Sequence, residues 1–511
     1  MNEKIELNEE FKKAFHMAEN TGKNLFITGR AGTGKSTFLE YFKRHTNKKA
    51  VFLAPTGVAA LNVGGETIHS FFGFKPDISA AKIKKINGKK AAMYSDIDII
   101  VIDEISMVRA DLLDYVDKFL KLNVKKAPFG GIQMLFIGDL YQLPPVVTSS
   151  EKGLFKTIYK SPYFFDSLSF KESDFELIEF EKVYRQKDEE FIKLLNSVRN
   201  KTAGGKEISF INSRVKSKIK EEKYMVWLTP YNSRAAQINE EKLYSLGAKT
   251  MQFQAQVQGD FGREYYPTDS ELSLAEGAQV MFLNNDSQQR WVNGTIGIVE
   301  EIYADSEDIC VRLQNGEIVN VEKHKWEIFH YEFDEHKKCI KIKVMGSFTQ
   351  FPLKLAWAVT IHKSQGKTYD KVILDIDRGT FAPGQLYVAL SRCRSLSGLT
   401  LQRPVKLSDI LSDWRVSKFL TEWQYKKAEK DISLEERHSI IEKTIKTGGE
   451  LEITYLKASN EKSIRRIKPL VISECEFQGH RFIALRAICR KAGEERSFKI
   501  ERILKIKEVS E

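Results

Sequence analysis

A glycine-rich segment near the N-terminus has the composition of a loop that holds phosphate groups. Residues 29–36 read GRAGTGKS and follow an apolar run, residues 25–27. In this GxxxxGK(S/T) pattern glycines let backbone N–H groups surround a β-phosphate, the lysine reaches the β- and γ-phosphate oxygens, and the hydroxyl binds Mg²⁺. An ordinary glycine-rich turn is the alternative, but a strand before and a helix after favour the phosphate loop. We therefore expect ATP and Mg²⁺ at Ala31, Gly32, Thr33, Gly34, Lys35, Ser36 and Thr37, with Ser36 as a metal ligand.

Two carboxylates follow another apolar run further along the chain. Residues 99–102 are Ile-Ile-Val-Ile, and Asp103 and Glu104 come directly after them. At the carboxyl end of a buried strand, Asp103 would hold Mg²⁺ through water and Glu104 would polarise the attacking water. Acidic residues also end strands as surface caps, but the phosphate loop upstream favours nucleotide hydrolysis.

A third apolar run, residues 134–137, leads into the segment GDLYQLPPV. Gln142 in this segment is suited to hydrogen-bond the γ-phosphate or the attacking water, and the two prolines stiffen the loop that would transmit the change. A proline-rich turn without a chemical role is the alternative interpretation.

Two arginines are candidates for completing such a site from a second domain. Charge that develops on the γ-phosphate is neutralised in nucleotide motors by cations that arrive when a cleft closes. Arg185 in VYRQ and Arg392 in YVALSRCR fit this role. Most arginines are simply solvated, so the neighbouring motifs, rather than the two residues alone, support the prediction.

Other segments have the chemistry to grip a sugar–phosphate backbone. APTGVAA (54–60) and TIHKSQGKT (360–368) offer hydroxyls and backbone N–H groups at the ends of strands and helices. The segment TIHSFF (67–72) adds the polar pair His69 and Ser70 beside aromatic residues, of which Phe72 would either stack on a base or belong to the core. The candidate nucleic-acid-binding residues are Pro55, Thr56, Gly57, His69, Ser70, Phe72, Thr229, Asn232, Thr360, His362, Lys363 and Ser364.

The elements that must position these residues alternate between strands and helices. Apolar runs at 25–27, 51–53, 99–102, 134–137, 225–228 and 372–374 predict buried strands, and helices are expected at 9–20 and 110–122. This alternation is typical of α/β folds with parallel sheets, and we expect two such sheets, one on each side of about residue 178.

Later segments change to alternating, glycine-punctuated strands, which predicts β-rich domains. The expected domains are a first sheet domain at 1–178 with a short insert at about 73–95, a second sheet domain formed by 179–252 and 350–412, an antiparallel β domain inserted at 253–349, and a C-terminal β-rich domain at 433–511.

Composition excludes several classes of protein. The 511 residues carry a formal net charge of +11, which suits a polyanionic partner. The five cysteines are never spaced as CxxC, so neither a disulfide framework nor a zinc site is indicated. No apolar run reaches roughly 18 residues and the N-terminus does not resemble a signal peptide, so we expect a cytoplasmic protein without a membrane partner.

Taken in order, the motifs resemble those of superfamily 1B helicases, specifically the petite-integration-frequency (PIF) family. The resemblance covers residues 20 to about 400. It includes, besides the segments above, VIDEISMVRADLLD, FGGIQMLFIGDLYQLPPV, WVNGTIG and FPLKLAWAVTIHKSQGKT. The segment 108–131 is similar to the signature that separates this family from RecD-like relatives.

The resemblance implies two RecA-like domains, an inserted Src-homology-3-like barrel and a wedge on the short insert. It implies 5′-to-3′ translocation on single-stranded DNA, unwinding of duplex or forked DNA at single-strand/double-strand junctions, and action on G-quadruplex or RNA–DNA substrates. It also places Gly366 at the nucleotide and implies a monomer in the absence of DNA, associated with the nucleoid.

At one point the sequence departs from the family. Members carry an adenine-reading Gln in a Leu-x-x-x-Gln pattern, whereas the pattern that starts at Leu7 ends here in Phe11. The departure weakens the expectation that adenine is selected and leaves room for another nucleoside triphosphate.

The C-terminal segment resembles a WYL module in Ile453–Leu456, Arg466–Pro469 and Arg496–Ile503, with Thr454 where the family has Trp. Such modules bind nucleic acid or small ligands, so four arginines would extend the DNA path: Arg465, Arg466, Arg486 and Arg502. A solvated basic face on a structural appendage is the alternative.

Two other functions remain open for the whole chain, a RecD-like repair subunit and a nucleotide-gated nucleic-acid-binding regulator.

Overall fold

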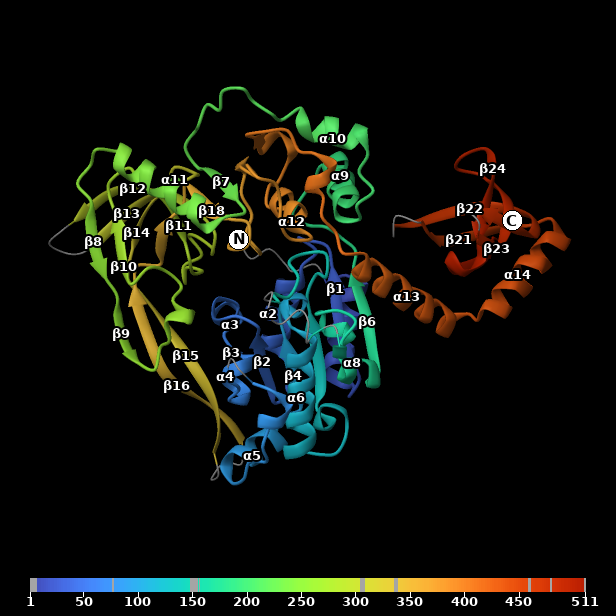
Figure 1. Cartoon of the computed structure of the whole chain (residues 1–511), viewed down its shortest axis with the longest axis horizontal. Helices are drawn as coiled ribbons and strands as arrows, with labels where there is room; N and C mark the ends of the chain where they lie inside the picture. The colour runs from blue at the N-terminus through green and yellow to red at the C-terminus, as the bar shows by residue number, and fades with distance from the viewer. Residues whose placement is uncertain are drawn as a thin grey trace. The chain divides into compact units, whose positions relative to one another are not determined.

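The N-terminal region is built on a parallel sheet of six strands (Figure 1). Its strands are, in spatial order, β3 (Glu66–Thr67), β2 (Ala50–Ala54), β4 (Ile99–Ile102), β5 (Gln133–Ile137), β1 (Asn24–Gly29) and β6 (Phe175–Phe180). The predicted strands at 25–27, 51–53, 99–102 and 134–137 are confirmed. These runs are buried because helices cover the sheet, so apolar side chains are favoured on both faces.

The structure is a computed structural model that describes residues 7–75, 78–147, 155, 157–303, 308–334, 339–457, 461–477 and 480–509. The chain divides into two units: Met1–Asn196 with Ala203–Leu411, and Ser197–Thr202 with Ser412–Glu511. Residues 76 and 77 of the expected short insert lie outside the described residues. Within those ranges, no helix is both long and apolar enough to cross a membrane.

Short and medium helices join the strands of the first sheet. They are α1 (Glu9–Asn20), α2 (Lys35–His45), α3 (Gly57–Val63), α4 (Ile68–Phe72), α5 (Lys89–Ser95), α6 (Ala110–Asn123) and α8 (Leu168–Glu172), with 3-10 turns η1 (Ala80–Lys82), η2 (Ile105–Met107), η3 (Pro128–Gly131) and η4 (Phe164–Asp166). The predicted helices at 9–20 and 110–122 are confirmed as α1 and α6.

A second parallel sheet has four strands, in the order β18 (Ala358–Thr360), β7 (Met225–Thr229), β19 (Lys371–Leu374) and β20 (Leu399–Leu401). The predicted strands at 225–228 and 372–374 are therefore confirmed. Its helices are α9 (Glu189–Arg199), α10 (Gly205–Asn212), α11 (Asn232–Ser245) and α12 (Gln385–Ser391), with η6 (Leu396–Gly398) and η7 (Leu407–Asp409).

Antiparallel strands occupy the chain between α11 and β18. A five-stranded sheet contains β14 (Ile318–Val321), β13 (Asp308–Leu313), β12 (Ile296–Tyr303), β11 (Gln279–Phe282) and β17 (Leu353–Leu355). A long hairpin of β15 (His324–Asp334) and β16 (Cys339–Gln350) pairs with β9 (Gln256–Gly259), and β10 (Glu271–Leu274) pairs with β8 (Met251–Gln254); η5 spans Arg263–Tyr265. We call residues 251–355 the insert; its hairpin strand β15 packs against α5.

The second unit contains its own antiparallel sheet and hydrophobic core. The sheet order is β24 (Glu494–Lys499), β23 (His480–Cys489), β22 (Lys462–Phe477), β21 (Glu450–Leu456) and β25 (Ile503–Val509). Helices α13 (Trp414–Asp431) and α14 (Leu434–Thr447) precede it, and η8 spans Ile500–Arg502. Ile441, Leu451, Ile453, Leu485 and Phe498 lie in the core of this unit.

Candidate nucleotide pocket and nucleic-acid interface

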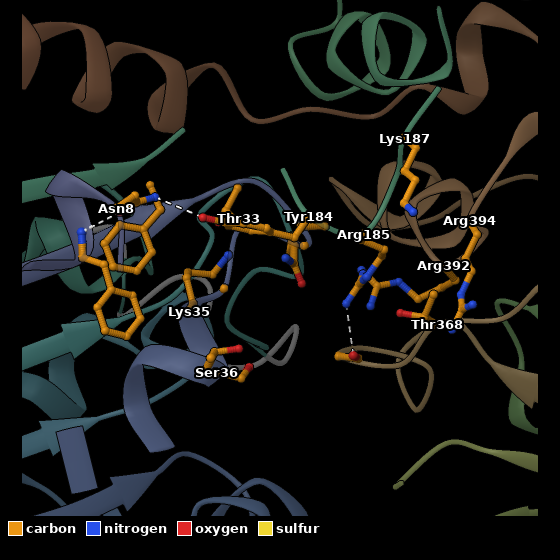
Figure 2. Close-up of a pocket in the computed structure, with 18 of the residues that line it drawn as sticks. Asn8, Thr33, Lys35, Ser36, Tyr184, Arg185, Lys187, Thr368, Arg392 and Arg394 are labelled. Atoms are coloured by element: carbon orange, nitrogen blue, oxygen red, sulfur yellow. Dashed lines mark hydrogen bonds between the residues drawn. The ribbon is translucent and has the colours of Figure 1, made fainter. Parts of the chain in front are cut away.

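A cavity of 1180 Å³ in the first unit brings together segments that are far apart in the sequence (Figure 2). Both parallel sheets and the segment that joins them contribute to its wall. The lining residues are Asn8, Phe11, Ala31, Gly32, Thr33, Gly34, Lys35, Ser36, Thr37, Glu104, Gln142, Phe180, Tyr184, Arg185, Lys187, Asp188, Gly366, Thr368, Arg392, Arg394 and Ser395. Every residue expected at the nucleotide therefore borders this cavity, apart from Asp103, which adjoins Glu104.

The glycine-rich loop joins β1 to α2, as the pattern predicted. Gly32 has φ +79°, and a Cβ at this position would lie 2.5 Å from the Cβ of Arg185, so only glycine allows this close approach. The Lys35 ammonium donates to the carbonyl oxygens of Gly29 (2.8 Å) and Arg30 (2.9 Å). These contacts hold the Lys35 side chain at the mouth of the loop.

The two carboxylates follow β4 and are half-buried. Glu104 has φ +50°, a left-handed conformation that is uncommon for a non-glycine residue and is typical of functional sites. Burial raises the pKa of Asp103, and Lys35 partly offsets the shift. Burial and then the charge of Asp103 raise the pKa of Glu104, while Lys35 and Arg392 lower it. A bound cation would favour the ionised carboxylates.

The ligands expected for Mg²⁺ fit a site that the nucleotide completes. The described residues contain no group of three or more His, Cys, Asp or Glu that could hold a metal ion alone. Mg²⁺ typically takes one or two protein oxygens together with waters and substrate phosphates. A hydroxyl at Ser36, in the first turn of α2, and a carboxylate at Asp103 supply this kind of donor set.

Gln142 lies in the loop that follows β5. Its side chain is buried, and its Nε2 donates to Asp139 Oδ2 (3.1 Å). Gln142 also lines the cavity, together with Lys35 and Glu104.

Arg392 is buried at the end of α12, with 1% of its surface exposed. Its Nε donates to the Val388 carbonyl (2.9 Å), and its Nη1 donates to the carbonyls of Lys367 (3.2 Å) and Ser364 (3.4 Å). Its Nη2 donates to the Ser391 hydroxyl (2.8 Å). These neutral acceptors orient the guanidinium without neutralising its charge.

Arg185 is held in the same way beside Arg392. Its Nη1 donates to the Ser391 carbonyl (3.3 Å) and its Nη2 to the Gly366 carbonyl (3.1 Å). Burial lowers the pKa of both guanidiniums, that of Arg392 to about 9 with the charge of Arg185 contributing. Among the described residues neither arginine forms an ion pair, so the pocket concentrates positive charge suited to an anionic ligand.

Two hydrogen bonds that sequence reasoning missed connect the two sheet regions. Gln365 Nε2 donates to Glu104 Oε2 (2.9 Å), and the Ala31 N–H donates to the Tyr387 hydroxyl (3.0 Å). Gln365 lies within the predicted track segment 360–368, so its segment was recognised but its contact with the carboxylate was not. Only the tertiary fold brings the two partners of each hydrogen bond together.

The candidate track residues differ in their exposure. Four are exposed: Thr56, Asn232, His362 and Lys363. Three are half-buried: Pro55, His69 and Ser70. Five are buried: Gly57, Phe72, Thr229, Thr360 and Ser364. The exposed members are available to a nucleic acid, whereas the buried side chains require another explanation.

The base-stacking role predicted for Phe72 is wrong. Only 4% of Phe72 is exposed, and its ring lies 5.3 Å from that of Phe119, 5.4 Å from Phe74 and 5.8 Å from Tyr94, measured between centroids. Aromatic contacts of this kind belong to a core. The alternative assignment, to the core, is the one that the structure supports.

The predicted contacts of three buried hydroxyls are also corrected. Ser364 Oγ donates to the Ile361 carbonyl (2.7 Å), and Thr360 Oγ1 accepts from the Lys363 N–H (3.4 Å). Thr229 is likewise almost fully buried. These side chains shape the loops that follow their strands, and the exposed neighbours in those loops remain as candidate contacts.

The insert covers part of the first track segment. A Cβ on Gly57 would lie 2.7 Å from the Glu264 carbonyl oxygen and 2.9 Å from the Tyr265 ring, so glycine allows η5 to approach α3. The Tyr265 hydroxyl also hydrogen-bonds Thr67 Oγ1 (3.0 Å). Residues of the insert therefore lie on the surface that was expected to face the track.

The long hairpin makes a second contact through a buried carboxylate. His330 Nδ1 lies 3.1 Å from Glu66 Oε2, and Ser70 Oγ donates to the same oxygen (3.0 Å). The hydrogen bond with Glu66 raises the pKa of His330. Ser70 is thus engaged in holding the insert.

Two aromatic residues, Tyr231 and Phe381, were missed beside the predicted His362, with which they form an aromatic ledge at the edge of the second sheet. The Phe381 ring, 56% exposed, lies 5.5 Å from the Tyr231 ring and 6.2 Å from the His362 ring. All three follow parallel strands, whose carboxyl ends meet at one edge of a sheet. The aromatic residues after β7 and β19 were the available signal, and they form a surface on which bases can stack.

Comparison with known proteins places these features in a family. A family model for PIF1-like helicases matches residues 6–208, and one for the UvrD-like helicase C-terminal domain matches residues 355–400. ATP-dependent DNA helicase Pif1 of Bdellovibrio bacteriovorus is 34% identical over 78% of this chain and 88% of its own length. Its Campylobacter jejuni counterpart is 32% identical over 75% of this chain and 90% of its own. The chain belongs to the PIF1-like helicase family.

Solved structures of Pif1 from Bacteroides resemble this PIF1-like helicase closely. The complex with ADP-AlF4 is 36% identical, covers 82% of this chain and 97% of its own, and superposes with a TM-score of 0.76. The unliganded form gives 0.75, whereas the form bound to single-stranded DNA gives 0.60. The mixed α/β fold is therefore that of Pif1 structures, and its arrangement is nearer to the forms without DNA.

Proposed function

We propose that this PIF1-like helicase hydrolyses ATP and uses the energy to move 5′-to-3′ along single-stranded DNA, unwinding duplex or forked DNA. One observation carries the proposal: Lys35 and Glu104 of the first sheet region share a single cavity with Arg185 and Arg392. A γ-phosphate in this cavity would be approached from two sides. The names of the relatives, ATP-dependent DNA helicases, support ATP as fuel and DNA as substrate.

Each pocket residue has a distinct task in this scheme. The loop N–H groups and Lys35 bind the phosphates, Glu104 polarises the attacking water, and Arg185 and Arg392 neutralise charge on the γ-phosphate. Gln142 responds to the presence of the γ-phosphate. Mg²⁺, held by Ser36 and Asp103, would supply further charge neutralisation at the phosphates.

The segment 360–368 links this chemistry to the track. Its carbonyls at Ser364, Gly366 and Lys367 accept hydrogen bonds from the two arginines. Its Gln365 holds Glu104, while His362 and Lys363 face solvent. A strand that binds the exposed residues would therefore shift the arginines and the carboxylate together, which couples hydrolysis to DNA.

DNA binding to the first sheet region requires the insert to leave Gly57. The lower TM-score of the DNA-bound Bacteroides form is consistent with such a rearrangement. We assign residues 253–349 to the Src-homology-3-like domain of the family. We assign the two sheets, in residues 1–178 and in residues 179–252 with 350–412, to RecA-like domains. The short insert at about 73–95 is assigned to the wedge, and G-quadruplex and RNA–DNA hybrids are further proposed substrates.

The C-terminal β-rich domain at 433–511 is proposed to be WYL-like. Arg466 pairs with Glu450, and Arg486 Nε donates to Glu495 Oε1 (2.6 Å). These pairs favour a structural role for the two arginines over an extended DNA path. We further propose a monomer in the absence of DNA and a location at the nucleoid.

A strand-separation assay tests the proposal directly. The full chain is given ATP, Mg²⁺ and 5′-tailed, 3′-tailed or G-quadruplex DNA at a fixed salt concentration, because phosphate contacts make affinity salt-dependent. We expect unwinding of the 5′-tailed duplex by the chain alone. Unwinding only of the 3′-tailed duplex would refute the polarity, and a requirement for partner proteins would favour a RecD-like subunit.

Removal of residues 412–511 separates a motor from a nucleotide-gated regulator. A motor keeps its DNA-stimulated ATP hydrolysis without this unit. A regulator whose C-terminal domain binds the target loses DNA binding instead, which would contradict the proposal.

A further inference from the structure

The nucleotide pocket has two ends of different character. Arg185, Arg392 and Arg394 lie on one side of the glycine-rich loop, and Asn8 lies on the other (Figure 2). Asn8, Phe11, Phe180 and Tyr184 line this second end. Because the loop holds the phosphates, the end opposite the arginines is where the base of a nucleotide would lie.

The side-chain amide of Asn8, at this end of the pocket, already forms two hydrogen bonds within the protein. Asn8 Oδ1 accepts from the Phe11 N–H (2.8 Å) as the N-cap of α1, and Asn8 Nδ2 donates to the Tyr184 hydroxyl (3.3 Å). An amide reads the edge of a base by presenting a donor and an acceptor together. The orientation of the Asn8 amide is set by α1 and by Tyr184 rather than by a base, and N-cap contacts of this kind are strongly preferred.

Phe11 presents no polar atom and is fixed in the core. Only 6% of it is exposed, and its ring lies 5.1 Å from Phe38, 5.4 Å from Tyr41 and 6.1 Å from Phe180. These rings anchor α1 against the first sheet. The wall of the pocket here is therefore shaped by packing rather than by hydrogen-bonding groups.

Tyr184 offers the face of a ring. It is 41% exposed, and its Cε2 lies 3.9 Å from where a Cβ on Gly34 would be, so the ring borders the phosphate loop. Every nucleobase has a π face that can stack on such a ring, whatever its edge presents.

We propose that the pocket binds the triphosphate specifically and holds the base by stacking alone, so that purine and pyrimidine nucleoside triphosphates all drive hydrolysis. The inference rests on the proposed function, since it concerns the same pocket. A site that hydrogen-bonds its substrate rejects an analogue lacking the group by roughly 10⁴-fold, whereas apolar pockets discriminate by about 10- to 200-fold at most. We therefore expect kcat/KM for ATP, GTP, CTP and UTP to differ by less than about 200-fold.

The experiment measures DNA-stimulated phosphate release by the full chain with each of the four nucleotides and Mg²⁺. Similar kcat/KM values support the inference. A preference for ATP of more than about 200-fold would overturn it while leaving ATP-driven helicase activity, and so the proposed function, intact.

Two variants test the route of recognition. Tyr184→Ala should raise KM for all four nucleotides by a similar factor, on the order of tenfold, because a stacking surface is lost. The matched control is Tyr244→Ala, since Tyr244 is 90% exposed and lies outside the pocket; its KM values should not change. Asn8→Ala should alter all four KM values in parallel, and a loss confined to ATP would show that Asn8 reads adenine and would overturn the inference.

Discussion

Two buried arginines, one in each unit, differ in the groups that accept their hydrogen bonds. Arg392, in the nucleotide pocket, is 1% exposed, and Arg437, on α14, is 2% exposed. Arg437 Nε and Nη2 donate to the Ile432 carbonyl (3.0 and 2.8 Å), and Nη2 also donates to Glu429 Oε2 (3.2 Å). Arg392 has neutral acceptors and a second arginine, Arg185, as its neighbour.

The difference lies in what balances the charge. Glu429 on α13 partly offsets the lowering of the Arg437 pKa by burial, so that side chain ties α13 to α14. The charge of Arg392 is balanced by no ion pair among the described residues, and it borders a cavity. A buried cation of the first kind stabilises the fold, whereas one of the second kind is prepared for an anionic ligand.

The largest effect is expected from replacing Lys35, the cation that lies across the cavity from Arg392. Lys35→Ala should reduce ATP hydrolysis and strand separation by on the order of 10³-fold or more, because the phosphates lose their direct ammonium contact. DNA affinity measured by fluorescence anisotropy should stay the same. Retained unwinding would contradict the two-sided arrangement of the pocket.

Replacing Arg392 tests the pocket half of the comparison. Arg392→Lys should lower kcat by about 10²- to 10³-fold, because an ammonium cannot reproduce the orienting contacts of the guanidinium. The thermal unfolding temperature should fall as well, because the carbonyls that accept from the guanidinium lose donors. A large drop in unfolding temperature with normal kcat would instead make Arg392 a structural residue like Arg437.

Gln365→Ala sharpens the link between the pocket and the track. Loss of the contact with Glu104 should lower DNA-stimulated kcat by about tenfold, as expected for a displaced catalytic group, with KM for ATP unchanged. Steady-state kinetics with and without single-stranded DNA measure this. Equal losses in kcat and in ATP affinity would show that Gln365 only supports the fold.

The smallest effect on catalysis is expected from Arg437. Arg437→Met should lower the free energy of unfolding of the second unit by about 2 kcal/mol, because the Ile432 carbonyl loses its donor, and should leave kcat unchanged. Denaturant unfolding monitored in parallel with hydrolysis measures both. Arg481→Met, at an exposed position, is the control that should leave both unchanged.

The pocket was more predictable than the track. Lys35, Glu104 and Gln142 each follow a buried strand, and strand ends of a parallel sheet meet at one edge, so short motifs sufficed to bring them together. Phe72 and Ser364 also lie in recognisable motifs, but whether a ring or hydroxyl faces solvent depends on what packs against it. That information is spread over segments far from the motif.

The sequence by itself determined six buried strands of the two parallel sheets, the helices at 9–20 and 110–122, the phosphate loop and the candidate catalytic side chains, because local periodicity and short motifs encode them. Only the tertiary structure decided that Gln365 contacts Glu104, that the insert lies on Gly57 and that the base end of the pocket has its amide engaged. The contacts of Gln365 with Glu104, of the insert with Gly57 and of Asn8 with Tyr184 join residues far apart in the chain, and their free energy comes from packing that no local pattern specifies.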